Sequence, residues 1–145
     1  MTEEGQEMHA ASYLRSREVI LDGDLLHDAN EWRRIFVHEL FHFAWVRLSN
    51  SGRESWRSLL AGEFRRRARG ELGWSAEWRK KLLTIGDLTS GGRRWKSYAC
   101  ESFCDTAAWL YAGLEQHEEF TLSRTWRKPR RRWFIEQFGD RAVPL

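Results

Sequence analysis

The chain has few cysteines, little net charge and no long apolar run, and each shortage removes a class of protein. Its 145 residues include two cysteines, Cys100 and Cys104, which lie too close in sequence to staple distant segments. We therefore expect a reduced, cytoplasmic setting rather than a disulfide-rich secreted domain. No stretch approaches about 18 uncharged apolar residues, so we expect no membrane span. The polar, acidic start also lacks the basic and apolar segments of a secretory signal.

The net charge of +3 is too small to indicate a nucleic-acid-binding protein by itself. Basic residues are nevertheless clustered between Arg124 and Arg132, where Trp126 lies among them. The interpretation we favour is a solvated helix face whose arginine stems cover aromatic rings. Binding of single-stranded RNA or DNA through Arg124–Arg132 is the alternative, because arginine interleaved with tryptophan also suits stacked bases.

Length and residue pattern predict one helix-rich domain over residues 1–145. Nine tryptophans and eight phenylalanines indicate a core or groove built from aromatic rings. Helical spacing, capping residues and glycine-rich breaks set the expected boundaries. In chain order we expect a short helix within 1–16, a strand at 19–21 with a turn at 22–24, a helix over 28–48 opened by an Asp28–Glu31 capping box, helices over 54–69 and 75–83, a loop at 86–92, a helix over 98–114 and a last helix from Pro129 to Gly139.

The stretch from Ile35 to Val46 is apolar except for His38, Glu39 and His42. A helix that is apolar nearly all round is buried, and charged or imidazole groups on it need partners or a metal ion. His42 lies only about 40° around the helix axis from His38, one turn along, so both imidazoles can converge on one ion. This is the H-E-x-x-H pattern, in which zinc lowers the pKa of a bound water to about 7 and the glutamate takes its proton. We therefore predict Zn2+ ligands His38 and His42, one ion, and Glu39 as general base.

A catalytic zinc site needs a third protein ligand and an open position. The helix expected over 98–114 carries only two charged residues, Glu101 and Asp105, one turn apart on one face. Glu101 fits as the third ligand. Asp105 fits as the carboxylate that orients a ligand histidine, and we expect that histidine to be His38. A solvent-exposed acidic stripe is the alternative, which the apolar character of the helix disfavours.

These two motifs resemble those of the gluzincins, zinc peptidases with H-E-x-x-H on one helix and E-x-x-x-D on a second. The matching segments are His38-Glu39-Leu40-Phe41-His42 and Glu101-Ser102-Phe103-Cys104-Asp105. The resemblance implies an α+β, zincin-like fold with an active-site helix, a small sheet and a second helix that bears the glutamate. It also implies that the segment 19–21 serves as an edge strand for extended peptide. The small size is similar to that of the minigluzincins and of the ImmA/IrrE peptidases.

Several assignments stay open at the level of sequence. Tyr98, Tyr111 and His117 are all candidates for stabilising an oxyanion, and for His117 a solvated surface position is favoured. Cys100 and Cys104 are spaced as soft metal ligands can be, although buried small apolar residues are the better interpretation. The predicted function is zinc-dependent hydrolysis of a peptide or protein substrate. The alternative is a non-catalytic or regulatory zinc-binding protein that binds or cleaves a transcriptional repressor.

Overall fold

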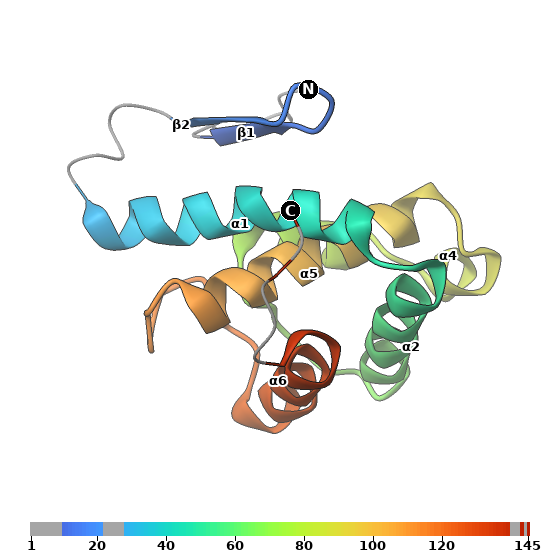
Figure 1. Ribbon diagram of the computed structural model, residues 1–145. Coiled ribbons are helices and arrows are strands. Elements are labelled where there is room, and N and C mark those ends of the chain that lie inside the picture. Colours follow the sequence, from blue (N-terminus) through green and yellow to red (C-terminus); the bar gives the residue numbers. More distant parts are fainter. Residues whose placement is uncertain (1–9, 22–27, 140–142, 144) are drawn as a thin grey trace.

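The computed structural model describes residues 10–21, 28–139, 143 and 145. These residues form a helix-rich α+β structure, as predicted, with six helices and one two-stranded antiparallel sheet. In chain order the elements are β1 (Ala10–Tyr13), β2 (Glu18–Leu21), α1 (Ala29–Arg47), α2 (Asn50–Arg65), α3 (Trp74–Lys81), α4 (Ile85–Ser90), α5 (Arg93–Tyr111) and α6 (Arg124–Phe138) (Figure 1). Within those ranges, no helix has the length and apolar character needed to cross a membrane.

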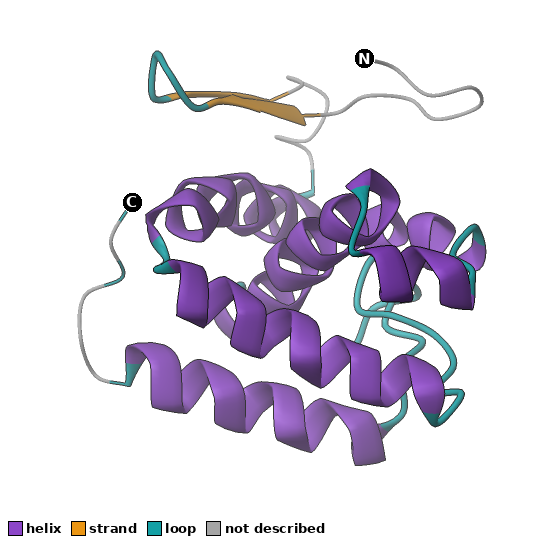
Figure 2. Cartoon of the chain, turned by 90° about the vertical axis from the view of Figure 1, so that its right-hand side faces the viewer, coloured by secondary structure: helices purple, strands orange, loops and turns teal. Residues whose placement is uncertain are grey.

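Strands β1 and β2 form a hairpin in which Ala10 lies opposite Leu21. The strand predicted at 19–21 is confirmed, whereas the helix expected within 1–16 is wrong over its described part, which is β1. Four residues gain more backbone hydrogen bonds from pairing with β2 than from an isolated helical turn, whose nucleation is unfavourable. The turn predicted at 22–24 lies outside the described residues. Both strands contact α1, and Figures 1 and 2 show the hairpin along one side of the helical body.

Helix α1 begins where the sequence predicts because Asp28 caps it. The Asp28 carboxylate accepts hydrogen bonds of 3.1 Å from two backbone amides of the first turn, including that of Glu31. The reciprocal half of the predicted capping box is absent among the contacts of the described chain, since the Glu31 carboxylate accepts hydrogen bonds from Arg34 instead. The helix ends at Arg47, close to the expected end.

Two further boundaries differ from expectation because local capping was missed. Helix α2 begins at Asn50 rather than at residue 54, since Ser49 accepts a 3.0 Å hydrogen bond from the amide of Gly52. The loop expected at 86–92 contains α4, which Thr84 and Asp87 open with a reciprocal capping box. Hydroxyl and acidic residues among glycines favour loops and helix starts alike, so their pattern did not distinguish the two.

The last two helices begin earlier than predicted. Helix α5 starts at Arg93 instead of Tyr98, and its extra first turn buries Trp95 in the core. Helix α6 starts at Arg124 and contains Pro129 in its interior, although it ends before Gly139 as expected. Proline inside a helix removes one backbone hydrogen bond. Side-chain packing of α6 on the core therefore outweighs that loss.

Helices α1 and α5 run antiparallel and form the centre of the molecule (Figure 1). The predicted aromatic core lies between them, α2 and α6. Trp56 is fully buried there and donates a 3.0 Å hydrogen bond from Nε1 to the carbonyl oxygen of Ala99. The aromatic rings packed in this core are those of Phe41, Trp45, Trp56, Trp95, Tyr98, Phe103, Trp133, Phe134 and Phe138.

A buried charge network fixes α6 against the other helices. Arg130 is 0% exposed and donates hydrogen bonds to both oxygens of Glu63 on α2 and both oxygens of Glu71 in the segment before α3. Outside the network, Arg127 and Arg131 of the same basic run lie over the ring of Trp109. Arg127 and Arg131 thus cover an aromatic ring as expected, whereas the buried Arg130 does not lie on the solvated face that the sequence predicts.

Candidate metal centre

Helix α1 presents His38 and His42 on one face, toward α5. His38 is 8% exposed, and the side chain of His42 is partly buried beside it. The ring centroids lie 5.1 Å apart with their planes at 72°. Two imidazoles one turn apart on a buried helix are thus brought together, as the H-E-x-x-H spacing predicts.

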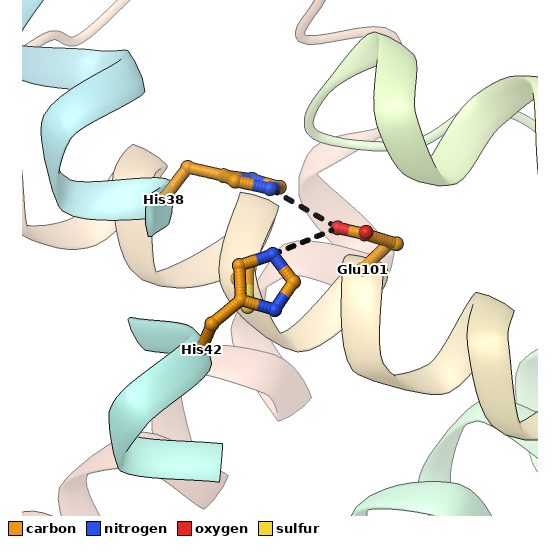
Figure 3. A group of neighbouring side chains, drawn as sticks. His38, His42 and Glu101 are labelled. Atoms are coloured by element: carbon orange, nitrogen blue, oxygen red, sulfur yellow. Dashed lines mark ion pairs between the residues drawn. The ribbon is translucent and has the colours of Figure 1, made fainter. Parts of the chain in front are cut away.

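Glu101 of α5 completes the cluster. Its Oε2 atom lies 3.0 Å from Nε2 of His38 and 3.5 Å from Nε2 of His42 (Figure 3). Neither contact has hydrogen-bond geometry, so Oε2 is a buried oxygen without a hydrogen-bond donor. Ligand atoms bound about 2.0–2.1 Å from a tetrahedral zinc ion are about 3.3 Å apart, a separation that these two contacts bracket. The three side chains therefore have the spacing of a metal site.

Asp105 stands behind His38, also as predicted. Its Oδ1 atom lies 2.6 Å from Nδ1 of His38, and its Oδ2 atom accepts a 2.9 Å hydrogen bond from the amide of Ala76 in the first turn of α3. Asp105 is 1% exposed, and a Cβ atom at Gly73 would collide with its carboxyl group. The carboxylate is thus held by the start of α3 and fixes both the orientation of His38 and which of its nitrogens carries the proton.

Burial and opposite charges shift the pKa values of the cluster. Burial lowers the pKa of His38, but Asp105 and Glu101 outweigh burial and raise that pKa well above its usual value. For His42, burial is likewise outweighed by Cys100 and Glu101, which raise the pKa to about 10. Burial raises the pKa of Glu101, but the two histidines hold it well below the ordinary range. Protonated imidazoles therefore balance the carboxylates of Glu101 and Asp105, and a metal ion bound here would displace protons from the histidines.

Glu39 occupies the flank of the same helix. It is 9% exposed and lies about 60° around the axis from His42, on the side of α1 away from the aromatic core. Within the described part of the chain, its carboxylate makes no hydrogen bond or ion pair. A carboxylate beside the two histidines and without a partner among the described residues is available to accept a proton.

The two cysteines take different positions beside the cluster. Cys104 is 0% exposed and belongs to the core, as predicted, with its Sγ atom within 4.8 Å of the ligand atoms of His38, His42 and Glu101. Cys100 is only partly buried, and its Sγ atom lies 3.6 Å from Nδ1 of His42. The sequence pattern missed this contact, because it depends on how α1 and α5 are aligned.

The structure does not bring the three predicted oxyanion candidates to the cluster. The Tyr98 hydroxyl donates to Glu71 in the buried charge network, and Tyr111 stacks on Phe41 at the far end of α5. Nε2 of His117 lies 2.7 Å from Oε2 of Glu31, so the surface position expected for His117 is wrong: the residue is partly buried and paired.

Two neighbouring groups were not expected from the sequence. Arg34 forms ion pairs with Glu31 and Glu119, so that the carboxylates beside His117 already have a cation. Arg79 of α3 reaches toward the candidate metal ligands, and its Nη2 atom lies 3.9 Å from Oε1 of Glu101. This oxygen is the one that does not face the histidines, so Arg79 adds positive charge at the edge of the site.

Comparison with known proteins adds no family assignment. No protein-family model, curated protein sequence or solved structure matches the chain. The cluster of His38, His42 and Glu101 is therefore the feature of this chain that bears on its function.

Proposed function

We propose that this chain is a zinc metallopeptidase of the gluzincin type with a zincin-like domain. The observation that carries the proposal is the convergence of two imidazole Nε2 atoms on a buried carboxylate oxygen that has no hydrogen-bond donor. Two nitrogens and one oxygen are a common ligand set of catalytic zinc in hydrolases. His38, His42 and Glu101 hold the ion in this proposal.

Each remaining group has a part in hydrolysis. A zinc ion held here by His38, His42 and Glu101 would supply Lewis acidity toward water and the substrate carbonyl. Glu39 accepts the proton of the attacking water and passes it to the leaving amine. Asp105 keeps the proton of His38 on Nδ1, so that Nε2 presents a lone pair to the ion.

The hairpin supports a peptide as substrate. Both strands pack on α1, the helix that carries His38, Glu39 and His42. Among the described residues the sheet has only two strands, so each has one edge without a partner strand. An extended peptide adds to such an edge through backbone hydrogen bonds, and β2 is the strand nearer in sequence to α1.

A second candidate function is a non-catalytic zinc site, favoured by the place of Cys104. A thiolate that joined the two histidines and Glu101 would give four protein ligands and no open position, as in structural zinc sites. A closed site gives no role to the carboxylate of Glu39 beside the two histidines, and for that reason we prefer the peptidase.

The two functions differ in the effect of Glu39→Gln. We expect this variant to bind zinc as the wild type does, and to lose about 10²–10⁴-fold in hydrolysis of labelled casein or of a mixed peptide library. Glu136→Gln, at an exposed position on α6, is the matched control. Full activity in Glu39→Gln would refute the proposed base. A wild-type protein that binds zinc and cleaves neither probe would favour the non-catalytic site.

A further inference from the structure

The outer nitrogens of the two histidines face different chemical groups on α5. Nδ1 of His38 lies 2.6 Å from an oxygen of Asp105, whereas Nδ1 of His42 lies 3.6 Å from the sulfur of Cys100. Both Nε2 atoms point the other way, toward Oε2 of Glu101. Each imidazole is thus contacted on both sides by α5.

The antiparallel packing of α1 and α5 explains this arrangement. Moving one turn along α1 from His38 to His42 corresponds to moving about one turn back along α5, from Asp105 to the position of Cys100 and Glu101. Cys100 therefore stands to His42 as Asp105 stands to His38. A histidine that binds a metal almost always has a partner for its second nitrogen, which fixes the ring and the tautomer.

We propose that Cys100 is the positioning residue of His42, a sulfur group in the place where a carboxylate or carbonyl oxygen usually stands. Its sulfur accepts a hydrogen bond from Nδ1–H of His42, and this contact holds Nε2 toward Glu101 and the metal. The inference rests on the proposed function, because it takes His42 as a metal ligand. Cys100 itself does not bind the ion in this arrangement, since its sulfur faces Nδ1 rather than Nε2.

Cys104 provides the internal comparison. It lies on the same helix one turn further on, is fully buried and packs in the aromatic core. Cys100 is only partly buried, so a serine can replace it without leaving a cavity in the apolar core. Loss of either thiol removes one sulfur from the helix, but only loss of Cys100 removes the contact to His42.

The test measures zinc affinity by competition with a chromophoric chelator in full-length wild type, Cys100→Ala, Cys100→Ser, Cys104→Ala and Glu136→Ala. We expect Cys100→Ala to bind zinc about 10–100-fold more weakly, the usual effect of losing such a partner. Cys100→Ser keeps an acceptor and should lie closer to wild type than to the alanine variant. Glu136→Ala, at an exposed position on α6, should keep its zinc affinity and serves as the control, whereas a loss in Cys104→Ala as large as in Cys100→Ala would overturn the assignment of this role to Cys100 alone. Equal affinity in wild type and Cys100→Ala would overturn the inference.

Cobalt(II) substitution adds a readout that a change in packing alone would not move. We expect the visible d–d bands of the cobalt protein to shift in Cys100→Ala and to return toward wild type in Cys100→Ser, because the orientation of His42 changes. A thiolate-to-cobalt charge-transfer band that disappears in Cys100→Ala would make Cys100 a direct ligand and overturn the positioning role. Wild-type protein that binds no zinc would overturn the proposed function together with this inference. Zinc binding without hydrolysis would overturn the function alone.

Discussion

Two substitutions of Asp105 separate its effect on stability from its proposed effect on zinc binding. Its carboxylate has two separate partners, since Oδ2 accepts from the amide of Ala76 and Oδ1 contacts Nδ1 of His38. Asp105→Ala removes both contacts. Asp105→Asn keeps an amide oxygen for Ala76 and places its NH₂ group against Nδ1 of His38.

The expected magnitudes follow from these partners. Loss of a hydrogen bond at the start of a helix costs about 1 kcal/mol, and loss of a buried hydrogen bond to a charged group costs about 1.5–3 kcal/mol. Asp105→Ala should therefore destabilise the metal-free protein by about 3 kcal/mol, or about 10 °C in Tm for a chain of this size. Asp105→Asn should lose less stability because the cap on α3 remains.

Zinc binding should respond differently from stability. In Asp105→Asn the amide group donates to Nδ1 of His38, which forces the proton onto Nε2, the nitrogen that faces Glu101. Both variants should therefore bind zinc about 10–100-fold more weakly. Thermal unfolding in the presence of a chelator measures the first effect, and competition with a chromophoric chelator measures the second. Wild-type zinc affinity in Asp105→Asn would refute the role given to Asp105.

Three further predictions concern the frame around the site. Arg130→Met leaves the carboxylates of Glu63 and Glu71 buried without their cation and should cost about 3–5 kcal/mol in chemical denaturation, whereas a loss below 1 kcal/mol would contradict the network. Burial raises the pKa of Glu71, but Arg130 outweighs burial and lowers that pKa below the ordinary value. The stabilisation that ionised Glu71 gives the fold is therefore complete above the pKa of an unfolded glutamate. It is lost as the pH falls through the lower pKa of the folded state. Tm should accordingly fall on acidification, and a Tm that rises there would contradict the sign. Gly73→Ala places a Cβ atom against the carboxyl group of Asp105 and should reduce both Tm and zinc affinity, and unchanged values would show that α3 does not hold Asp105.

The candidate cluster of His38, His42 and Glu101 was predictable because its parts are local. The H-E-x-x-H spacing alone places His38 and His42 on one face of a helix, and the four-residue spacing of Glu101 and Asp105 does the same on α5. Each motif stood out because the stretch around it, 35–46 or 98–114, carries no other charged residue. A buried polar group needs a partner, and the two helices carried complementary ones.

The parts that escaped prediction depend on contacts between distant segments. Arg130 looked like one of six basic residues on a surface, and only the packing of α6 against Glu63 and Glu71 buries it. Cys100 looked like a small apolar residue because its neighbour His42 is 58 positions away. Tyr98 lies on the face of α5 that turns toward Glu71 rather than toward His38 and His42.

The metal content of the purified protein tests the central claim most directly. Elemental analysis of wild type, Glu101→Ala and the exposed control Glu136→Ala, each purified without added metal or chelator and then dialysed against trace zinc, compares the three under one condition. We expect about one zinc per chain in wild type and in Glu136→Ala, and a clear loss in Glu101→Ala, because a catalytic zinc site depends on all three protein ligands. Wild-type protein without zinc, or equal zinc in all three proteins, would contradict the assignment of His38, His42 and Glu101 as a metal site.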